Sequence, residues 1–183
     1  MSSFKIENDA PVRMMILKSL IQENNSFIKK ADTIPFIPEI TSNIRPLIIN
    51  IIKEIRELEP DNNTSLIFGW CCYAGLGATM HWHIDWSQLN KKGIYTALTE
   101  ERGIFQMDEY VLDLIGLPYD GKEAQKLTKH LQEAAHKAII QMAKITMNQS
   151  QDVISNAFLE TCEAMYWYGM VLQMNRIGFQ YIL

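Results

Sequence analysis

The chain has 183 residues, of which 48% are hydrophobic and 21% charged, a composition typical of a globular protein rather than a disordered or collagen-like one. Its 17 basic and 21 acidic residues give a formal net charge of −4, the wrong sign for a protein whose whole surface holds nucleic acid or an anionic membrane. Nine glycines and six prolines are few for this length, which favours helices over a turn-rich sandwich or barrel.

The N-terminal half contains three long segments with helical periodicity. After an N-terminal extension, residues 1–10, Pro11 sits where a helix can begin, and apolar residues recur at helical spacing to about residue 30. Residues 31–41 contain two prolines and no periodic pattern, so they are predicted to be a connecting region. Hydroxyl side chains at its end offer an N-cap for a second helix, which ends at Pro60. A third helix is predicted over about residues 65–86.

The C-terminal half begins less regularly. Residues 87–106 are predicted to be a connecting region with short helices, because glycines interrupt them. A short helix follows over residues 107–115. Asp120, with a glutamate three residues later, has the form of a capping box that begins a long helix. Ser150 is the expected cap of the last helix, predicted over about residues 151–175.

The last helix is the most informative predicted element. From Ala164 to Met174 it is apolar around most of its circumference. A helix without a polar face is either central in its domain or shared with a partner. The sequence therefore predicts an all-α, single-domain helical bundle over residues 1–183, with five to seven helices packed around an apolar C-terminal helix.

The cysteines and the charge pattern bear on location. The three cysteines are odd in number, and Cys71 and Cys72 are adjacent, which argues against a long-range disulfide framework and for a reducing, cytoplasmic location. We see no secretory signal in the first twenty residues.

The longest uncharged stretch, residues 66–80, is shorter than the roughly 20 residues that span a bilayer. It is therefore predicted to be a buried helix, and no membrane partner is expected. Lysines of the long helix after Asp120 alternate with glutamates and indicate a solvated face rather than a nucleic-acid site.

A first candidate site is His81-Trp82-His83-Ile84-Asp85. On a strand both imidazoles and the carboxylate would share one face, ready to bind a metal. On the predicted helix, His81 and Asp85 are neighbours while His83 points roughly the opposite way. We therefore expect His81 to be a hydrogen-bonded packing residue, with metal binding and acid–base chemistry as alternatives.

A second candidate is the Glu-x-x-His element formed by Glu133 and His136, the spacing that di-iron carboxylate bundles use. Those sites need a second copy and two further glutamates, and Glu160 and Glu163 of the last helix supply carboxylates without a following histidine. We interpret Glu133, His136 and the neighbouring His130 as a solvated helix face. No metal and no cofactor are expected.

Small residues and cysteines in residues 69–78 are interpreted as packing elements. Ala74, Ala78 and His81 share one helix stripe with Gly77 adjacent, so another helix backbone could approach closely there, and no complete Gly-x-Gly-x-x-Gly phosphate loop is present. Cys71, Cys72 and Cys162 lie in apolar surroundings and are predicted to be inert core residues.

The function that we expect is protein–protein interaction without catalysis, with the chain forming a homo-oligomer or binding another protein. The predicted interaction residues are Trp167, Met170 and Met174, since methionines and aromatics form adaptable apolar surfaces. Two alternatives stay open. One is a carboxylate–histidine metal enzyme in the bundle core, which would use Glu133, His136, Glu160, Glu163 and His81. The other is a protein that binds an apolar small molecule.

Overall fold

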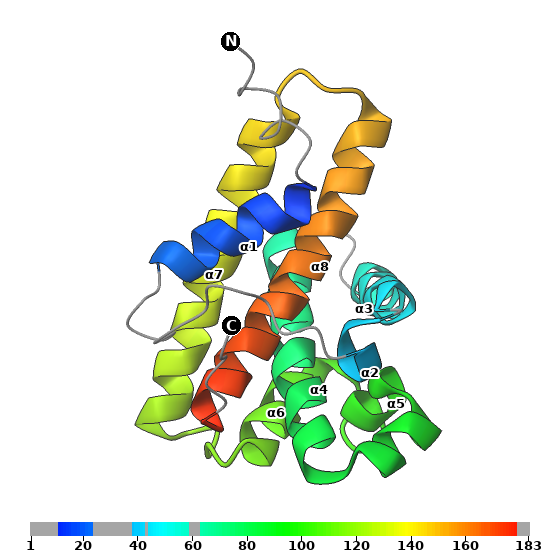
Figure 1. Cartoon of the computed structure of the whole chain (residues 1–183), viewed down its shortest axis with the longest axis vertical. Helices are drawn as coiled ribbons and strands as arrows, with labels where there is room; N and C mark the ends of the chain where they lie inside the picture. The colour runs from blue at the N-terminus through cyan, green and yellow to red at the C-terminus, as the bar shows by residue number, and fades with distance from the viewer. Residues whose placement is uncertain (1–10, 24–37, 43, 59–62, 179–183) are drawn as a thin grey trace.

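The computed structural model describes residues 11–23, 38–42, 44–58 and 63–178. These residues form helices joined by turns, without any strand, and thereby confirm the predicted all-α fold (Figure 1). The eight α-helices include two short ones, of four and six residues, beyond the five to seven predicted. The elements are α1 (Val12–Glu23), α2 (Pro38–Thr41), α3 (Arg45–Leu58), α4 (Thr64–Lys92), α5 (Ile94–Thr99), the 3-10 helix η2 (Ile104–Gln106), α6 (Met107–Leu114), α7 (Lys122–Thr146) and α8 (Gln151–Arg176).

The long helices lie where periodicity predicted them, with differences at their ends. The third predicted helix continues six residues further, to Lys92, and the backbone of Asp85, with φ −158° and ψ 87°, interrupts it next to the predicted end. Ser150 is the N-cap of α8 as predicted, although its side chain makes no capping hydrogen bond. The capping box at Asp120 is wrong, because Gly121 is the N-cap of α7 and no side chain caps that helix.

The structure describes only part of the predicted extension and connecting regions. The extension, residues 1–10, and most of residues 31–41 lie outside the described residues, as does the end of the first predicted helix, and Pro38–Thr41 forms the single turn α2. Residues 87–106 hold the end of α4, then α5 and η2.

Helix α8 is the centre of the structure. It is one unbroken helix of 26 residues, and from Thr161 to Met174 every residue except Trp167 is buried. Helix α4 crosses it, while α1, α3 and α7 pack on its other sides (Figure 1). The apolar C-terminal helix is therefore buried because other helices of the same chain surround it.

The crossing of α4 and α8 is close because both helices carry a glycine there. A β carbon on Gly75 would overlap the backbone carbonyl of Tyr166, and one on Gly169 would overlap that of Cys72. Gly77 instead faces the side chains of Leu98 and Val111, which belong to α5 and α6. A helix backbone therefore does approach this small-residue segment, but at Gly75, while the predicted position at Gly77 meets side chains.

Candidate functional site

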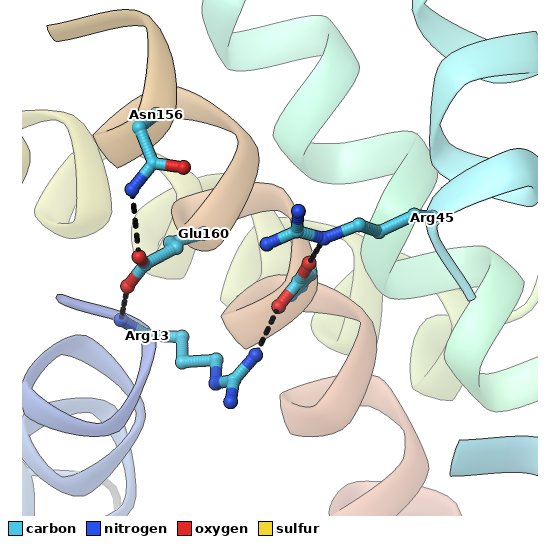
Figure 2. A network of polar contacts seen from close by, with 5 residues as sticks. Arg13, Arg45, Asn156 and Glu160 are labelled. Carbon is cyan, nitrogen blue, oxygen red and sulfur yellow. Dashed lines mark hydrogen bonds and ion pairs between the residues drawn. The ribbon is translucent and has the colours of Figure 1, made fainter. Parts of the chain in front are cut away.

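A buried carboxylate joins three helices on one side of α8 (Figure 2). The Glu163 side chain is only 3% exposed. Arg13 of α1 donates from Nη1 to its Oε2 at 2.8 Å, and Arg45, the first residue of α3, donates from Nε to its Oε1 at 2.6 Å. Two cations thus compensate the buried charge, and Glu163 in turn raises the pKa of Arg45.

Glu160 lies one turn before Glu163 and extends this network (Figure 2). It accepts a hydrogen bond from the backbone N–H of Arg13 at 3.2 Å and another from Nδ2 of Asn156 at 2.9 Å. The Arg13 N–H belongs to the first turn of α1, where backbone donors have no partner within the helix. The Arg13 guanidinium also lies over the ring of Trp167, 5.3 Å from its centroid. Of the three carboxylates in the metal hypothesis, Glu160 therefore attaches α1 to α8, and Glu163 attaches both α1 and α3 to it.

The other candidate metal ligands lie elsewhere. Glu133 and His136 are exposed on α7, and Glu133 faces Lys129 at 4.0 Å. His81 is half-buried, its Nε2 is 3.1 Å from the hydroxyl of Tyr110, and burial lowers its pKa. Nowhere in the described ranges do three histidine, cysteine, aspartate or glutamate side chains gather closely enough to hold a metal ion.

The prediction that His130 lies on a solvated face is wrong. It is buried, and its Nε2 lies 2.7 Å from the hydroxyl of Tyr168 on α8, while burial lowers its pKa. The sequence did contain a signal, because His130 is adjacent to the apolar stripe that includes Leu127, Leu131 and Ala134. A histidine at the edge of such a stripe reaches the interior when a hydroxyl there accepts or donates a hydrogen bond.

The three cysteines are buried and free, as predicted. Burial raises the pKa of Cys72 and of Cys162 well above the ordinary thiol value. A thiol that stays protonated is a poor nucleophile. This cluster is therefore part of the packing between α4 and α8.

The predicted interaction residues occupy different environments. Met170 and Met174 are buried within the single chain, and Trp167 is half-buried next to Arg13. The Nε1 atom of Trp167 is buried and has no hydrogen-bond partner among the described residues. Of the three side chains, only that of Trp167 keeps a partly accessible surface.

A groove of about 800 Å³ lies between α3 and the first turns of α8, and we call it the α3–α8 groove. Ile49 on its α3 side is 53% exposed. The guanidinium of Arg56 lies over the ring of Phe158, 5.5 Å from its centroid, and Lys53 is paired with Glu57 at 3.9 Å. The groove is thus apolar with a charged rim. Its lining residues are Ile49, Ile52, Lys53, Arg56, Glu57, Thr64, Met142, Gln151, Ile154, Ser155, Phe158 and Leu159.

A smaller cleft of about 370 Å³ lies between α4 and α7, with the first turn of α6 at its edge. We call it the α4–α7 cleft. It mixes aromatic and apolar side chains with hydroxyl, amide and carboxylate groups. Its lining residues are Asn63, Ser65, Leu66, Gly69, Trp70, Tyr73, Asp108, Thr128, Leu131 and Gln132.

Comparison with known proteins adds no family to this description. No family model, no curated protein and no solved structure matches the chain. Within the described residues, no helix has both the length and the apolar character needed to cross a membrane.

Proposed function

We propose that this chain acts as a single helical domain in protein–protein interaction, and that it self-associates through the α3–α8 groove without catalysing a reaction. The observation that carries the proposal is the groove itself. Ile49, Phe158 and their apolar neighbours line a surface depression large enough for the side chains of a helix. Apolar surface of this kind is stabilised when a partner removes it from water.

The shape of the groove favours a helix as its occupant. Further along α8, helix α4 covers the stripe of α8 residues that contains Phe158 and Tyr166. The rings of Phe68 on α4 and Phe158 on α8 are in contact there, with their centroids 5.5 Å apart. Helix α4 begins only at Thr64. The same stripe continues towards the start of α8 through Ser155 and Gln151, which line the groove. A helix placed end to end with α4 would cover this remaining part.

A second copy of the chain can supply such a helix. At the end of the molecule where α7 meets α8, Met147 is 70% exposed and Val153 of the first turn of α8 is also exposed (Figure 1). Asp152, next to Val153, is an acidic residue suited to the basic rim residue Arg56. In a twofold dimer the groove-lining face at the start of one α8 would meet the same face of the other copy, so one surface would serve both copies.

The metal-enzyme alternative has less support than interaction. Glu160 and Glu163 already bind Arg13, Arg45 and Asn156.

For the cellular location, the three free cysteines support a reducing compartment, and we propose the cytoplasm.

Sedimentation velocity of the purified protein tests the proposal over concentrations from about 1 to about 100 µM. The wild type should show a monomer–dimer equilibrium, and Ile49→Glu should shift it to monomer while circular dichroism stays unchanged. Ile140→Glu is the matched control, because Ile140 is 42% exposed on α7 and does not line the groove. A wild type that stays monomeric throughout, or an Ile140→Glu variant that dissociates as fully as Ile49→Glu, would contradict the proposal.

A charge exchange tests the twofold arrangement directly. Arg56→Asp and Asp152→Arg should each weaken the dimer, because each places like charges opposite one another. The double variant should recover part of the lost affinity, since it restores the pair with the signs reversed. Loss of affinity that simply adds up in the double variant would rule out this contact.

A further inference from the structure

The α4–α7 cleft has an aromatic wall held in a fixed position. The ring centroids of Trp70 and Tyr73 are 5.9 Å apart with the ring planes at 52°. The Tyr73 hydroxyl is hydrogen-bonded to Oγ1 of Thr128 at 2.8 Å, which ties the ring of α4 to α7. Trp70 and Tyr73 both line the cleft, and the electron-rich faces of aromatic rings attract cations.

A carboxylate without a cation lies at the edge of this wall. Asp108 lines the cleft, it is half-buried, and it forms no ion pair in the part of the chain that the structure describes. Burial raises its pKa, while hydrogen bonds from the backbone of Glu109 and of Asp108 itself act in the opposite direction, and no cation is among the causes of the shift. Asp108 and Tyr73 line the same cleft, where burial raises the pKa of Tyr73 and the charge of Asp108 adds to this shift.

The wall leaves room for a ligand on the α4 side. A β carbon on Gly69 would meet no heavy atom within 4 Å, so the helix backbone is accessible from the cleft there. The neighbouring Trp70 carries a buried Nε1 with no acceptor among the described residues. The volume of about 370 Å³ is at the lower end of the range of about 300–1,000 Å³ found for small-molecule sites.

We infer that the α4–α7 cleft binds a small organic ammonium compound. The ammonium group lies between the aromatic wall and the Asp108 carboxylate, and the apolar body of the compound fills the space over Gly69 and Leu66. The two attractions act on the same positive charge, and neither is satisfied by a neutral compound of the same shape. The cleft and the α3–α8 groove share no lining residue, so this site is independent of the proposed self-association.

Tyramine and its neutral analogue tyrosol, in which a hydroxyl replaces the amine, form a matched pair of probes. Their binding is followed by nuclear magnetic resonance at the Trp70 indole N–H signal, which is assigned by its loss in Trp70→Phe. Tyramine should shift this signal saturably with a Kd below about 1 mM, and tyrosol should bind at least about tenfold more weakly. Equal affinity for the two compounds, or no saturable shift by tyramine up to about 10 mM, would overturn the inference.

Two variants separate the contributions of charge and space. Asp108→Asn should reduce tyramine binding to the level of tyrosol, with an unchanged circular dichroism spectrum. Gly69→Leu should block both compounds, because its side chain fills the cleft without meeting another residue at its β carbon. Unchanged tyramine affinity in either folded variant would show that the compound binds elsewhere and would overturn the assignment.

Discussion

Gly75 of α4 and Gly169 of α8 allow two helix backbones to touch. Each glycine faces a carbonyl of the opposite helix, Gly75 that of Tyr166 and Gly169 that of Cys72. Because a β carbon has no space at either position, the two glycines set how closely α4 approaches α8. The buried surface on both helices depends on that distance, since interior side chains pack without room to spare.

Replacing Gly75 by alanine should therefore destabilise the protein, although alanine is the better helix former. We expect a loss of about 1–3 kcal/mol or more in the free energy of unfolding, because the backbones must separate. Gly69→Ala on the same helix is the control, since its β carbon meets nothing within 4 Å. It should raise stability by about 0.5–1 kcal/mol. Urea unfolding followed by circular dichroism measures both, and equal stability of the two variants would contradict a backbone contact at Gly75.

The helices could be predicted from the sequence because their signals are local. The apolar period of residues 107–115 and 151–175 needs only neighbouring positions, and α6 and α8 follow it closely. The burial of residues 161–174, apart from Trp167, fits the absence of a polar face between Ala164 and Met174, from which a helix either central in its domain or shared with a partner was expected. The capping box predicted at Asp120 shows the limit of such local signals. The N-cap of α7 is Gly121, one residue later, so the Asp120 side chain does not cap the helix.

The polar contacts could not be predicted, because they join positions far apart in the chain. Glu163 binds Arg45 and Arg13, which lie 118 and 150 residues away. No local pattern identifies these partners, and the sequence offers Glu163 only as a carboxylate of the metal alternative. The same holds for His130, whose burial depends on Tyr168, 38 residues further on. In both cases a polar side chain is satisfied by a partner on another helix.

Glu163→Gln should weaken the attachment of α1 and α3 to α8. The amide keeps the shape but loses the charge that holds Arg13 and Arg45. Breaking a fully buried pair costs about 3–5 kcal/mol, and the partly exposed arginines reduce the expected loss to about 1–3 kcal/mol. Glu133→Gln, which removes an exposed pair with Lys129, should cost at most about 0.5 kcal/mol. Thermal unfolding compares the two, and similar small losses would mean that the network contributes no more than a surface pair.

His130 should make stability depend on pH. Burial is the largest cause that lowers its pKa, while Glu133 and Lys137 act in opposite directions. Because the folded pKa is below the unfolded value of about 6.5, the unfolded chain binds more protons at low pH. The contribution of His130 to the free energy of unfolding is then fully present above about pH 6.5 and is lost as the pH falls through its folded pKa. For this one proton the loss is at most about 1.4 kcal/mol per pH unit.

His130→Gln tests this dependence, since glutamine can still hydrogen-bond the Tyr168 hydroxyl but does not titrate. Urea unfolding between about pH 7 and about pH 5.5 stays above the range where most carboxyl groups titrate. The variant should lose less stability across this range than the wild type. His81, whose pKa burial also lowers, should account for a remaining slope. An identical slope in the variant and the wild type would show that His130 takes up its proton equally well in both states.

Met170→Glu distinguishes a core from an interface at the centre of α8. Met170 is fully buried within the single chain. A glutamate there would place a charge in the interior without a cation beside it, or would reach water only by disrupting the packing of the helices. We expect a loss of more than about 4 kcal/mol and a collapse of the helical circular dichroism signal. Met170→Leu, which conserves volume, should cost less than about 1.5 kcal/mol. Ile49→Glu at the groove should change the stability of the monomer by no more than about 0.5 kcal/mol. If Met170→Glu instead remained folded and only lost self-association in sedimentation velocity, Met170 would lie in an interface and the packing of α8 described above would have to be revised.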